Sequence, residues 1–130
     1  MARVEVAAAI IERRGKFLIT QRTGNQHLAG RWEFPGGKRK WGETLKRCLQ
    51  RELREELGLE VQVKKRLCLV NYKYQDRIVR ISFFRCCVVG GQLRAQEGQP
   101  VAWVRYAQLR QRKFPQADLD LIRYLARSKQ

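Results

Sequence analysis

The sequence predicts an α/β sandwich, in which helices cover a central mixed β-sheet. Several stretches rich in β-branched and aromatic residues, separated by glycines and polar turns, are typical of strands. Two other stretches place apolar residues at helical spacing, one in the first half of the chain and one at its end. The 130 residues contain no repeat, linker or low-complexity tract, so we expect a single domain over residues 1–130.

The expected strands follow one another along most of the chain. The first two form a hairpin around Gly15, a residue suited to a tight turn. A short strand then ends at Pro35-Gly36-Gly37, which we expect to be a loop. Two long strands joined by a polar turn come next, followed by one more short strand. The expected strand segments are residues 3–12, 13–22, 31–34, 61–74, 77–89 and 100–106.

Two main helices are expected. The first begins near Glu43 and Thr44 and ends at Gly58, because glycine is the usual residue after a helix C-terminus. The second covers residues 118–129 and is amphipathic. Its apolar side consists of Leu119, Ile122, Leu125 and Ala126. These helices supply the two outer layers of the sandwich.

The chain carries 28 Lys+Arg against 12 Asp+Glu, a formal net charge of +16. Such a charge can serve nucleic-acid binding, attraction of a polyanionic small substrate, or simple solvation. The basic residues are dispersed and no run exceeds three, which argues against a dedicated DNA-reading element. No apolar run approaches the ~18–20 residues of a membrane span, and the start lacks a signal-peptide pattern. With four cysteines that lack CxxC spacing, we expect reduced thiols in a cytoplasmic protein.

Three glutamates, Glu52, Glu55 and Glu56, lie close together near the end of the first helix. On a helical wheel Glu52 and Glu56 share the sector of the apolar stripe, and Glu55 lies beside it. The carboxylates are therefore expected to face the protein or a cleft in it. Mutual repulsion, the helix dipole and desolvation all disfavour that placement.

A divalent cation would offset this concentration of negative charge. Arg51 and Arg54 are adjacent in sequence, but residues one apart point about 100° away from each other, so we expect incomplete neutralisation by arginine. All-oxygen ligands favour Mg²⁺ or Mn²⁺ over Zn²⁺. The Gly36-Gly37 turn can add a backbone carbonyl as a further hard ligand. The alternative is a surface ion-pair network.

The segment from Gly37 to Leu59 resembles the Nudix box, G-x5-E-x7-R-E-U-x-E-E-x-G-U, in which U is a bulky aliphatic residue. The stretches AAAIIERRGKFLITQR, HLAGRWEFPGGK, EGQPVAWV and FPQAD extend the resemblance over nearly the whole chain, to the MutT-type members that sanitise nucleotide pools. The resemblance implies the Nudix fold. Every fixed position of the box is met, by Gly37, Glu43, Arg51, Glu52, Leu53, Glu55, Glu56, Gly58 and Leu59.

The resemblance also implies an enzyme, one that hydrolyses a nucleoside triphosphate to the monophosphate and pyrophosphate with Mg²⁺, or Mn²⁺ as a substitute. It makes Glu52 the base that takes the proton of the attacking water, with Glu97 as the alternative. Arg51 would orient the carboxylates of the box, and Glu43 would support the metal site. The implied metal ligands are Gly36, Glu52, Glu55, Glu56 and Glu97.

On the substrate side, the resemblance assigns a phosphate contact to Arg22. Asp118 stands where enzymes best known for 8-oxo-dGTP carry Asn. An ionised Asp only accepts hydrogen bonds, so it would favour a base edge rich in N–H donors or require its own protonation, which argues against strict selectivity for oxidised guanine. The resemblance still favours an 8-oxo-dGTP-like substrate, and CTP or 5-methyl-dCTP is the alternative. The implied nucleoside pocket consists of His27, Glu33, Phe34, Pro35, Arg77 and Asp118.

The net charge of +16 keeps one hypothesis of a different class open, a Nudix module that binds nucleic acid or acts on RNA 5′ ends. The complete box argues against a purely binding role, and the segments EGQP and FPQAD favour small nucleotides. We therefore expect a nucleoside triphosphate as the partner, no membrane, and a monomer.

Overall fold

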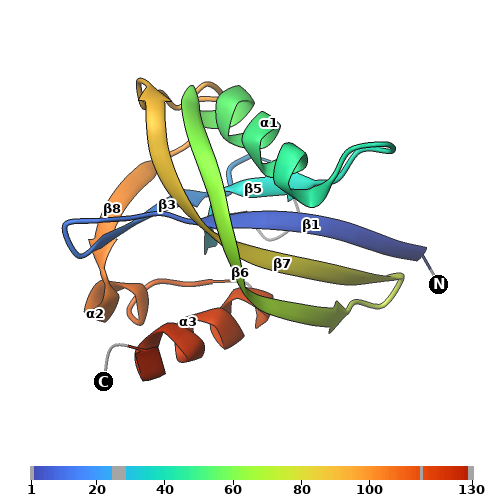
Figure 1. Ribbon diagram of the computed structural model, residues 1–130. Helices are drawn as coiled ribbons and strands as arrows, with labels where there is room; N and C mark the ends of the chain where they lie inside the picture. The colour runs from blue at the N-terminus through green and yellow to red at the C-terminus, as the bar shows by residue number, and fades with distance from the viewer. Residues whose placement is uncertain (1, 25–28, 115, 129–130) are drawn as a thin grey trace.

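The computed structural model describes residues 2–24, 29–114 and 116–128. The elements follow the expected order along the chain, from the hairpin at the N-terminus to the C-terminal helix (Figure 1). Their bounds are β1 (Ala2–Ile10), β2 (Glu12–Arg13), β3 (Lys16–Gln21), β4 (Trp32–Glu33), β5 (Gly36–Lys38), α1 (Leu45–Leu57), β6 (Leu59–Lys73), β7 (Arg77–Gly91), β8 (Val101–Arg105), α2 (Tyr106–Leu109) and α3 (Gln116–Ser128).

The predicted mixed sheet is confirmed, and its ladders divide into two groups. One sheet has the order β5-β1-β7-β6. In the other, β3 pairs with β2, β4 and β8. β1 runs parallel to β7 over its whole length, from Ala2 opposite Arg77 to Ile10 opposite Arg85. The other pairings between described strands are antiparallel. The parallel pair joins segments about half the chain apart.

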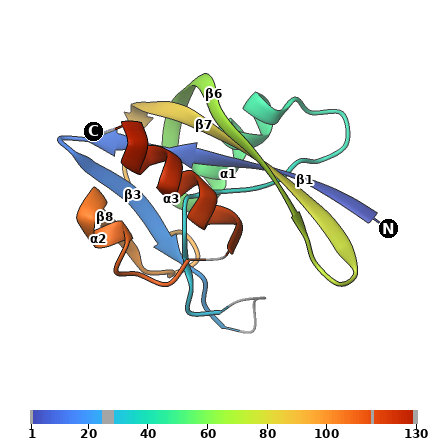
Figure 2. The same cartoon turned by 90° about the horizontal axis from the view of Figure 1, so that it is seen from below.

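Helices α1 and α3 cover opposite faces of the larger sheet, as the sandwich architecture requires (Figures 1 and 2). Alternate residues of β1 enter different cores, because successive strand side chains point to opposite faces. Ala7 and Ala9 pack on the α1 side, whereas Ala8 and Ile10 pack on the α3 side. The helices contribute Cys48, Leu49, Leu53 and Leu57 from α1 and Leu121, Ile122 and Leu125 from α3.

The ends of α1 agree with the sequence prediction. The side chain of Thr44 caps the helix by accepting a hydrogen bond from the Arg47 N–H at 3.1 Å. Gly58 ends it in the left-handed region, with φ of 67°. Both ends of α1 are therefore fixed, and so are the positions of Glu52, Glu55 and Glu56 in its second half.

Two elements were not predicted. Gly36 and Gly37 lie in β5, opposite Ala8 and Ala7 of β1, and do not form the expected loop. α2 is a single helical turn between β8 and α3. None of the helices in residues 2–24, 29–114 and 116–128 is long and apolar enough to cross a membrane. All four cysteines are free thiols, as expected.

Candidate active site

The glutamates at the end of α1 differ in their exposure. The Glu52 side chain is only 16% exposed, whereas that of Glu55 is 54% exposed. Glu56 is half-buried. The helical-wheel prediction is therefore confirmed for Glu52 and Glu56, and Glu55 lies at the rim of the cluster. Glu52 also abuts the backbone of β5, because a Cβ atom added to Gly37 would lie 2.3 Å from the carboxyl carbon of Glu52.

Arg51 binds three carboxylates at once. Its guanidinium donates to Glu43 at 2.7 and 3.1 Å, to Glu52 at 2.9 Å and to Glu55 at 3.2 Å. It also donates to the Lys38 carbonyl at 3.2 Å, which ties α1 to β5. The hydrogen bond from Arg51 is the main reason that the pKa of Glu43 falls to about 2. The long side chain of Arg51 thus reaches further than its wheel position suggests.

Glu56 remains without such compensation. No ion pair joins it to any basic residue in the described part of the chain. Burial raises the pKa of Glu56 to about 9, and a hydrogen bond with Glu52 and the charges of Glu52, Glu33 and Glu97 add to this effect. Carboxylates from α1, β4 and the loop before β8 therefore lie near enough to Glu56 to raise its pKa. The expectation of incomplete neutralisation by arginine holds at Glu56.

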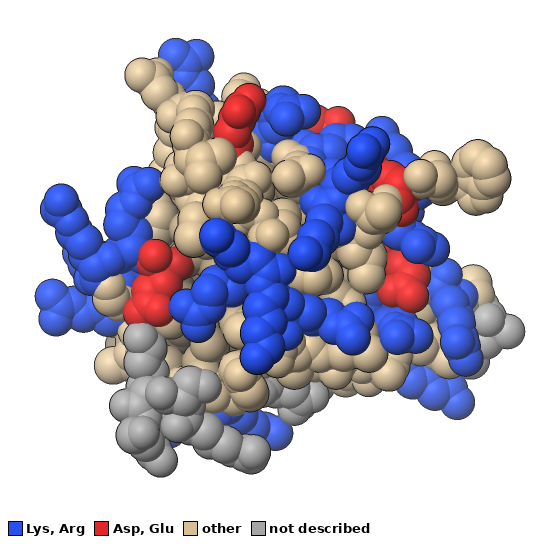
Figure 3. All heavy atoms as spheres, viewed as in Figure 1, with Lys and Arg blue, Asp and Glu red and all other residues tan. Residues whose placement is uncertain are grey.

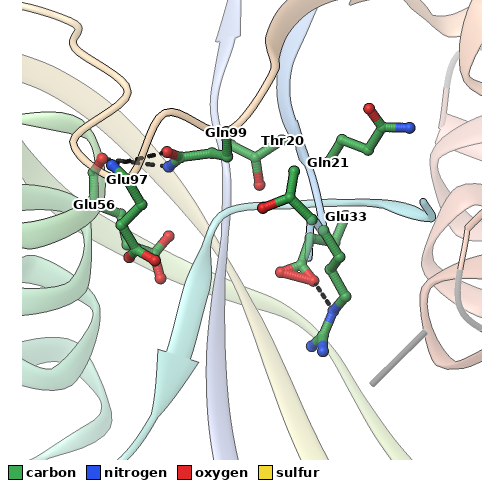
Figure 4. A pocket seen from close by; sticks show the side chains of 8 residues that line it. Thr20, Gln21, Glu33, Glu56, Glu97 and Gln99 are labelled. Atoms are coloured by element: carbon green, nitrogen blue, oxygen red, sulfur yellow. Dashed lines mark hydrogen bonds and ion pairs between the residues drawn. The ribbon is translucent and has the colours of Figure 1, made fainter. Parts of the chain in front are cut away.

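The loop before β8 is fixed to the end of α1 by the helix's unpaired carbonyls. The Glu56 carbonyl accepts hydrogen bonds from the Gln96 N–H at 2.9 Å and the Gln99 side chain at 3.4 Å. The Gln99 side chain in turn accepts from the Glu97 N–H at 3.1 Å. Figure 4 shows the result, with the side chains of Glu56 and Glu97 adjacent. Local helix-end chemistry thus brings together two acidic residues 41 positions apart.

These residues line a polar cavity, and the end of β3 forms its other wall (Figure 4). Arg22 lies in that wall and pairs with Glu33. The sequence identified Arg22, Glu33, Glu56 and Glu97, but gave no chemical signal for their uncharged neighbours. The additional lining residues are Thr20, Gln21, Thr23 and Gln99.

Asp118, at the start of α3, is buried beside this cavity. Burial raises the pKa of Asp118 to about 8, assisted by the charge of Glu33 and opposed by the N–H of Phe34 and by Arg22. The Phe34 ring itself belongs to the core, where it stacks on Phe114 with ring centroids 5.6 Å apart. Of the predicted nucleoside pocket, Glu33, Asp118 and the Phe34 backbone therefore lie together.

The remaining pocket residues are placed differently. Pro35 is buried, and its carbonyl accepts from the Ala9 N–H at 2.8 Å. Arg77 begins β7 and lies over the ring of Tyr74, 5.5 Å from its centroid. The charges of Arg22 and Asp118 both act on the Tyr74 hydroxyl, so Tyr74 borders the same region, which the sequence did not indicate. His27 lies outside the described residues.

The carboxylate oxygens of the acidic cluster are the kind of ligand that a hard divalent cation prefers. Among the described residues, no three His, Cys, Asp or Glu side chains surround one point as metal ligands. Arg51 holds Glu52 and Glu55, while burial, assisted by the neighbouring carboxylates, raises the pKa of Glu56. All available donors are oxygen atoms, which Mg²⁺ and Mn²⁺ prefer. The cluster thus fits such an ion in charge and ligand type.

Without a metal, the protein is expected to lose stability as the pH rises. Folded Glu56 keeps its proton up to a pKa of about 9, whereas an ordinary Glu releases it near 4.5; for Asp118 the values are about 8 and 3.8. Between these limits the unfolded chain binds fewer protons, so the free energy of unfolding falls with pH, by an amount on the order of several kcal/mol. Urea unfolding in EDTA from pH 5 to 8 measures this slope.

The pH dependence of the free energy of unfolding can be tested with two Glu→Gln variants, one at Glu56 and one at an exposed control position. Glu56→Gln should reduce the slope by about half, because the amide is neutral at every pH while Asp118 still contributes. Glu60→Gln should leave the slope unchanged because Glu60 is 60% exposed. An equal slope in the parent protein and the Glu56→Gln variant would contradict the assignment.

Comparison with known proteins identifies the family of this chain. The CTP pyrophosphohydrolase of Escherichia coli (strain K12) is 38% identical over 122 residues, 94% of this chain and 90% of that protein. The 8-oxo-dGTP diphosphatase of the same strain is 33% identical over 128 residues, 98% and 99% of the two chains. The solution structure of the E. coli ORF135 protein superimposes with a TM-score of 0.83 at 36% identity, covering 97% of this chain and 91% of that one. A family model described as the NUDIX domain matches residues 1–125, and this chain therefore belongs to the Nudix family.

Proposed function

We propose that this protein is a metal-dependent nucleoside-triphosphate pyrophosphohydrolase, which releases a nucleoside monophosphate and pyrophosphate. The observation that carries the proposal is that Glu33, Glu56 and Glu97 line a polar cavity together with Arg22. Glu52 adjoins this group through its hydrogen bond with Glu56. The names of the relatives, a CTP pyrophosphohydrolase and an 8-oxo-dGTP diphosphatase, support small nucleotides as substrates. They do not favour the alternative of an RNA-end or nucleic-acid-binding Nudix module.

We assign three roles to residues of this chain: a general base, two positioning residues and a phosphate-binding residue. We assign Glu52 as the base, because it is nearly buried yet faces the cluster, and a positioned carboxylate can take the proton of an attacking water. Arg51 and Glu43 are positioning residues, since Arg51 fixes the Glu52 carboxylate and Glu43 fixes Arg51. Arg22, at the opposite wall, would bind the phosphates.

Nudix hydrolases generally need a divalent metal ion, usually Mg²⁺. In this chain the residues proposed to hold it are Gly36, Glu52, Glu55, Glu56 and Glu97. When bound, the ion supplies charge neutralisation for the triphosphate and makes water a better nucleophile. Arg51 contacts one oxygen of Glu52 and one of Glu55, which leaves the other oxygen of each carboxylate for this role, whereas Glu56 would have to lose its proton.

A nucleotide panel tests the proposal. The panel contains dGTP, 8-oxo-dGTP, CTP, 5-methyl-dCTP and a 5′-triphosphorylated RNA, each with Mg²⁺, with Mn²⁺ or with EDTA. We expect pyrophosphate release from the free nucleotides in the presence of either metal and none in EDTA. Absence of turnover with every triphosphate, or turnover of the RNA alone, would refute the assignment.

Among the bases, we propose an 8-oxo-dGTP-like substrate read by Asp118. With a pKa of about 8, the Asp118 carboxyl keeps its proton at neutral pH, so it can both donate and accept a hydrogen bond as an Asn does. The selectivity for 8-oxo-dGTP over dTTP, as a ratio of kcat/KM values, should then fall about tenfold per pH unit above pH 8.

Asp118→Asn provides the comparison for this pH effect. The amide is neutral and retains both a donor and an acceptor, so the variant should keep its selectivity within a few-fold at pH 7 and show no decline to pH 9.5. The ratio cancels pH effects on the shared hydrolysis step. Parallel profiles in the two proteins would contradict the role of Asp118. A preference for CTP or 5-methyl-dCTP would support the alternative substrate.

A further inference from the structure

Trp41 is fully exposed, with a relative accessibility of 101%. It lies in the loop between β5 and α1, which projects from the body of the protein (Figure 1). A tryptophan side chain usually buries most of its large apolar surface. The other two tryptophans follow this rule, because Trp32 and Trp103 are both partly buried against the cores. The exposure of Trp41 therefore calls for an explanation.

The loop that carries Trp41 is held in place by hydrogen bonds on both sides. The Glu43 carboxylate accepts from the Lys40 N–H at 2.8 Å, and the Glu43 N–H donates to the Lys40 carbonyl at 3.2 Å. The Arg39 N–H donates to the Glu5 carbonyl at 2.8 Å. Gly42 permits the turn with φ of 85°. The backbone of the loop is thus ordered before binding, so that a partner has to order only the exposed side chains.

Three consecutive cations, Lys38, Arg39 and Lys40, precede Trp41, and all three are exposed. None of them forms an ion pair with an acidic residue in the described ranges. Lys38 adjoins the Arg51 guanidinium through its carbonyl. Trp41 precedes the start of α1, which is about 17 Å along the helix from Glu56 at the cavity. Figure 3 shows that basic side chains also dominate the face formed by β6, β7 and α1. The surroundings of the loop therefore favour an anionic partner.

We propose that the Trp41 loop, residues 38–42, binds single-stranded nucleic acid. The indole ring stacks on an unpaired base, and the three cations contact the adjoining phosphates. A duplex fits less well, because its bases are already stacked. A membrane surface also fits less well, because interfacial binding needs a broader apolar face than one ring, and the rest of the loop is cationic or glycine. This binding is independent of the pyrophosphohydrolase activity.

The test is fluorescence anisotropy with labelled 20-mers of oligo(dT) and oligo(rU), in salt from 50 to 300 mM. Trp41→Ala should weaken binding about 5- to 150-fold, the range for loss of one stacked base. It should leave the melting temperature and nucleotide hydrolysis unchanged, because the side chain touches nothing. Replacing Lys38, Arg39 and Lys40 together by Gln should lower the slope of log K against log salt by about 2.

A matched triple variant separates this site from general charge. Lys64, Lys65 and Arg66 on β6 are also exposed and consecutive, so their replacement by Gln removes the same net charge elsewhere. Val89→Ala, on β7, controls for loss of an exposed apolar side chain, 64% exposed. Equal losses in the two triple variants, equal binding of a duplex, or no oligonucleotide binding would overturn the proposal. So would binding to phosphatidylserine vesicles but not to oligonucleotides.

Discussion

Glu52→Gln is expected to lower kcat by about 10²- to 10⁴-fold at saturating Mg²⁺, the range for loss of a general base. The amide keeps the size of the side chain and can still accept the hydrogen bond from Arg51, which is 2.9 Å long. It cannot take a proton from water. Steady-state pyrophosphate release over a range of Mg²⁺ concentrations separates this effect from weaker metal binding, which added metal would overcome.

Glu60→Gln is the control for this variant, because Glu60 is an exposed glutamate on β6 paired only loosely with Arg54 at 4.0 Å. Its kcat should stay within about twofold of the parent, as expected for a surface substitution. A loss below tenfold for Glu52→Gln, together with a larger loss for Glu97→Gln, would transfer the role of base to Glu97.

Gly37→Ala is expected to abolish most of the activity while preserving most of the stability. A Cβ atom at this position would lie 2.3 Å from the Glu52 carboxyl carbon and 2.6 Å from each of its oxygens. The far end of a flexible side chain can move aside at low cost, but the moved carboxylate is the proposed base. We therefore expect kcat to fall about 10²-fold or more, because misplacement of a catalytic group by about 1 Å has effects of this size.

The adjacent glycine provides the contrast. At Gly36 an added Cβ would lie 2.0 Å from the Ala7 carbonyl oxygen, which is backbone and cannot move without separating β5 from β1. Gly36→Ala should therefore destabilise the fold by about 1–3 kcal/mol or more, measured by urea unfolding of both variants. The reverse order of stability, or full activity in Gly37→Ala, would contradict this account of the two glycines.

The first glycine of the Nudix box shows how a sequence motif and its physical cause can be separated. Its position was evident from the spacing to Glu43 and Arg51, but the spacing gave no reason for a glycine. The reason lies in the approach of β5 to α1, where the Gly37 backbone meets the Glu52 carboxylate. β5 itself was missed because glycines carry no strand propensity, and its pairing partner Ala7 is 30 residues away.

The neutralisation of the acidic cluster on α1 was also predicted only in part from the sequence. The sequence indicated that arginine would leave part of the acidic cluster uncompensated, and this is true of Glu56. It did not indicate that one guanidinium, that of Arg51, would satisfy Glu43, Glu52 and Glu55 together. A helical wheel gives the direction of each Cα–Cβ bond, whereas the charged group at the end of a long side chain such as Arg51 can lie in another direction.

The sequence by itself determined the elements whose signals are local: the span of α1 from its Thr44 cap to Gly58, the long strands, and the acidic motif. Only the tertiary structure decided that burial raises the pKa of Glu56 and of Asp118, that Glu33 and Glu97 add to the effect on Glu56, and that Glu33 adds to the effect on Asp118. The physical reason is that helix periodicity and capping act over a few residues, whereas burial and electrostatic repulsion depend on which distant segments are brought together. Here β3 pairs with both β4 and β8, and the loop before β8 is hydrogen-bonded to the end of α1.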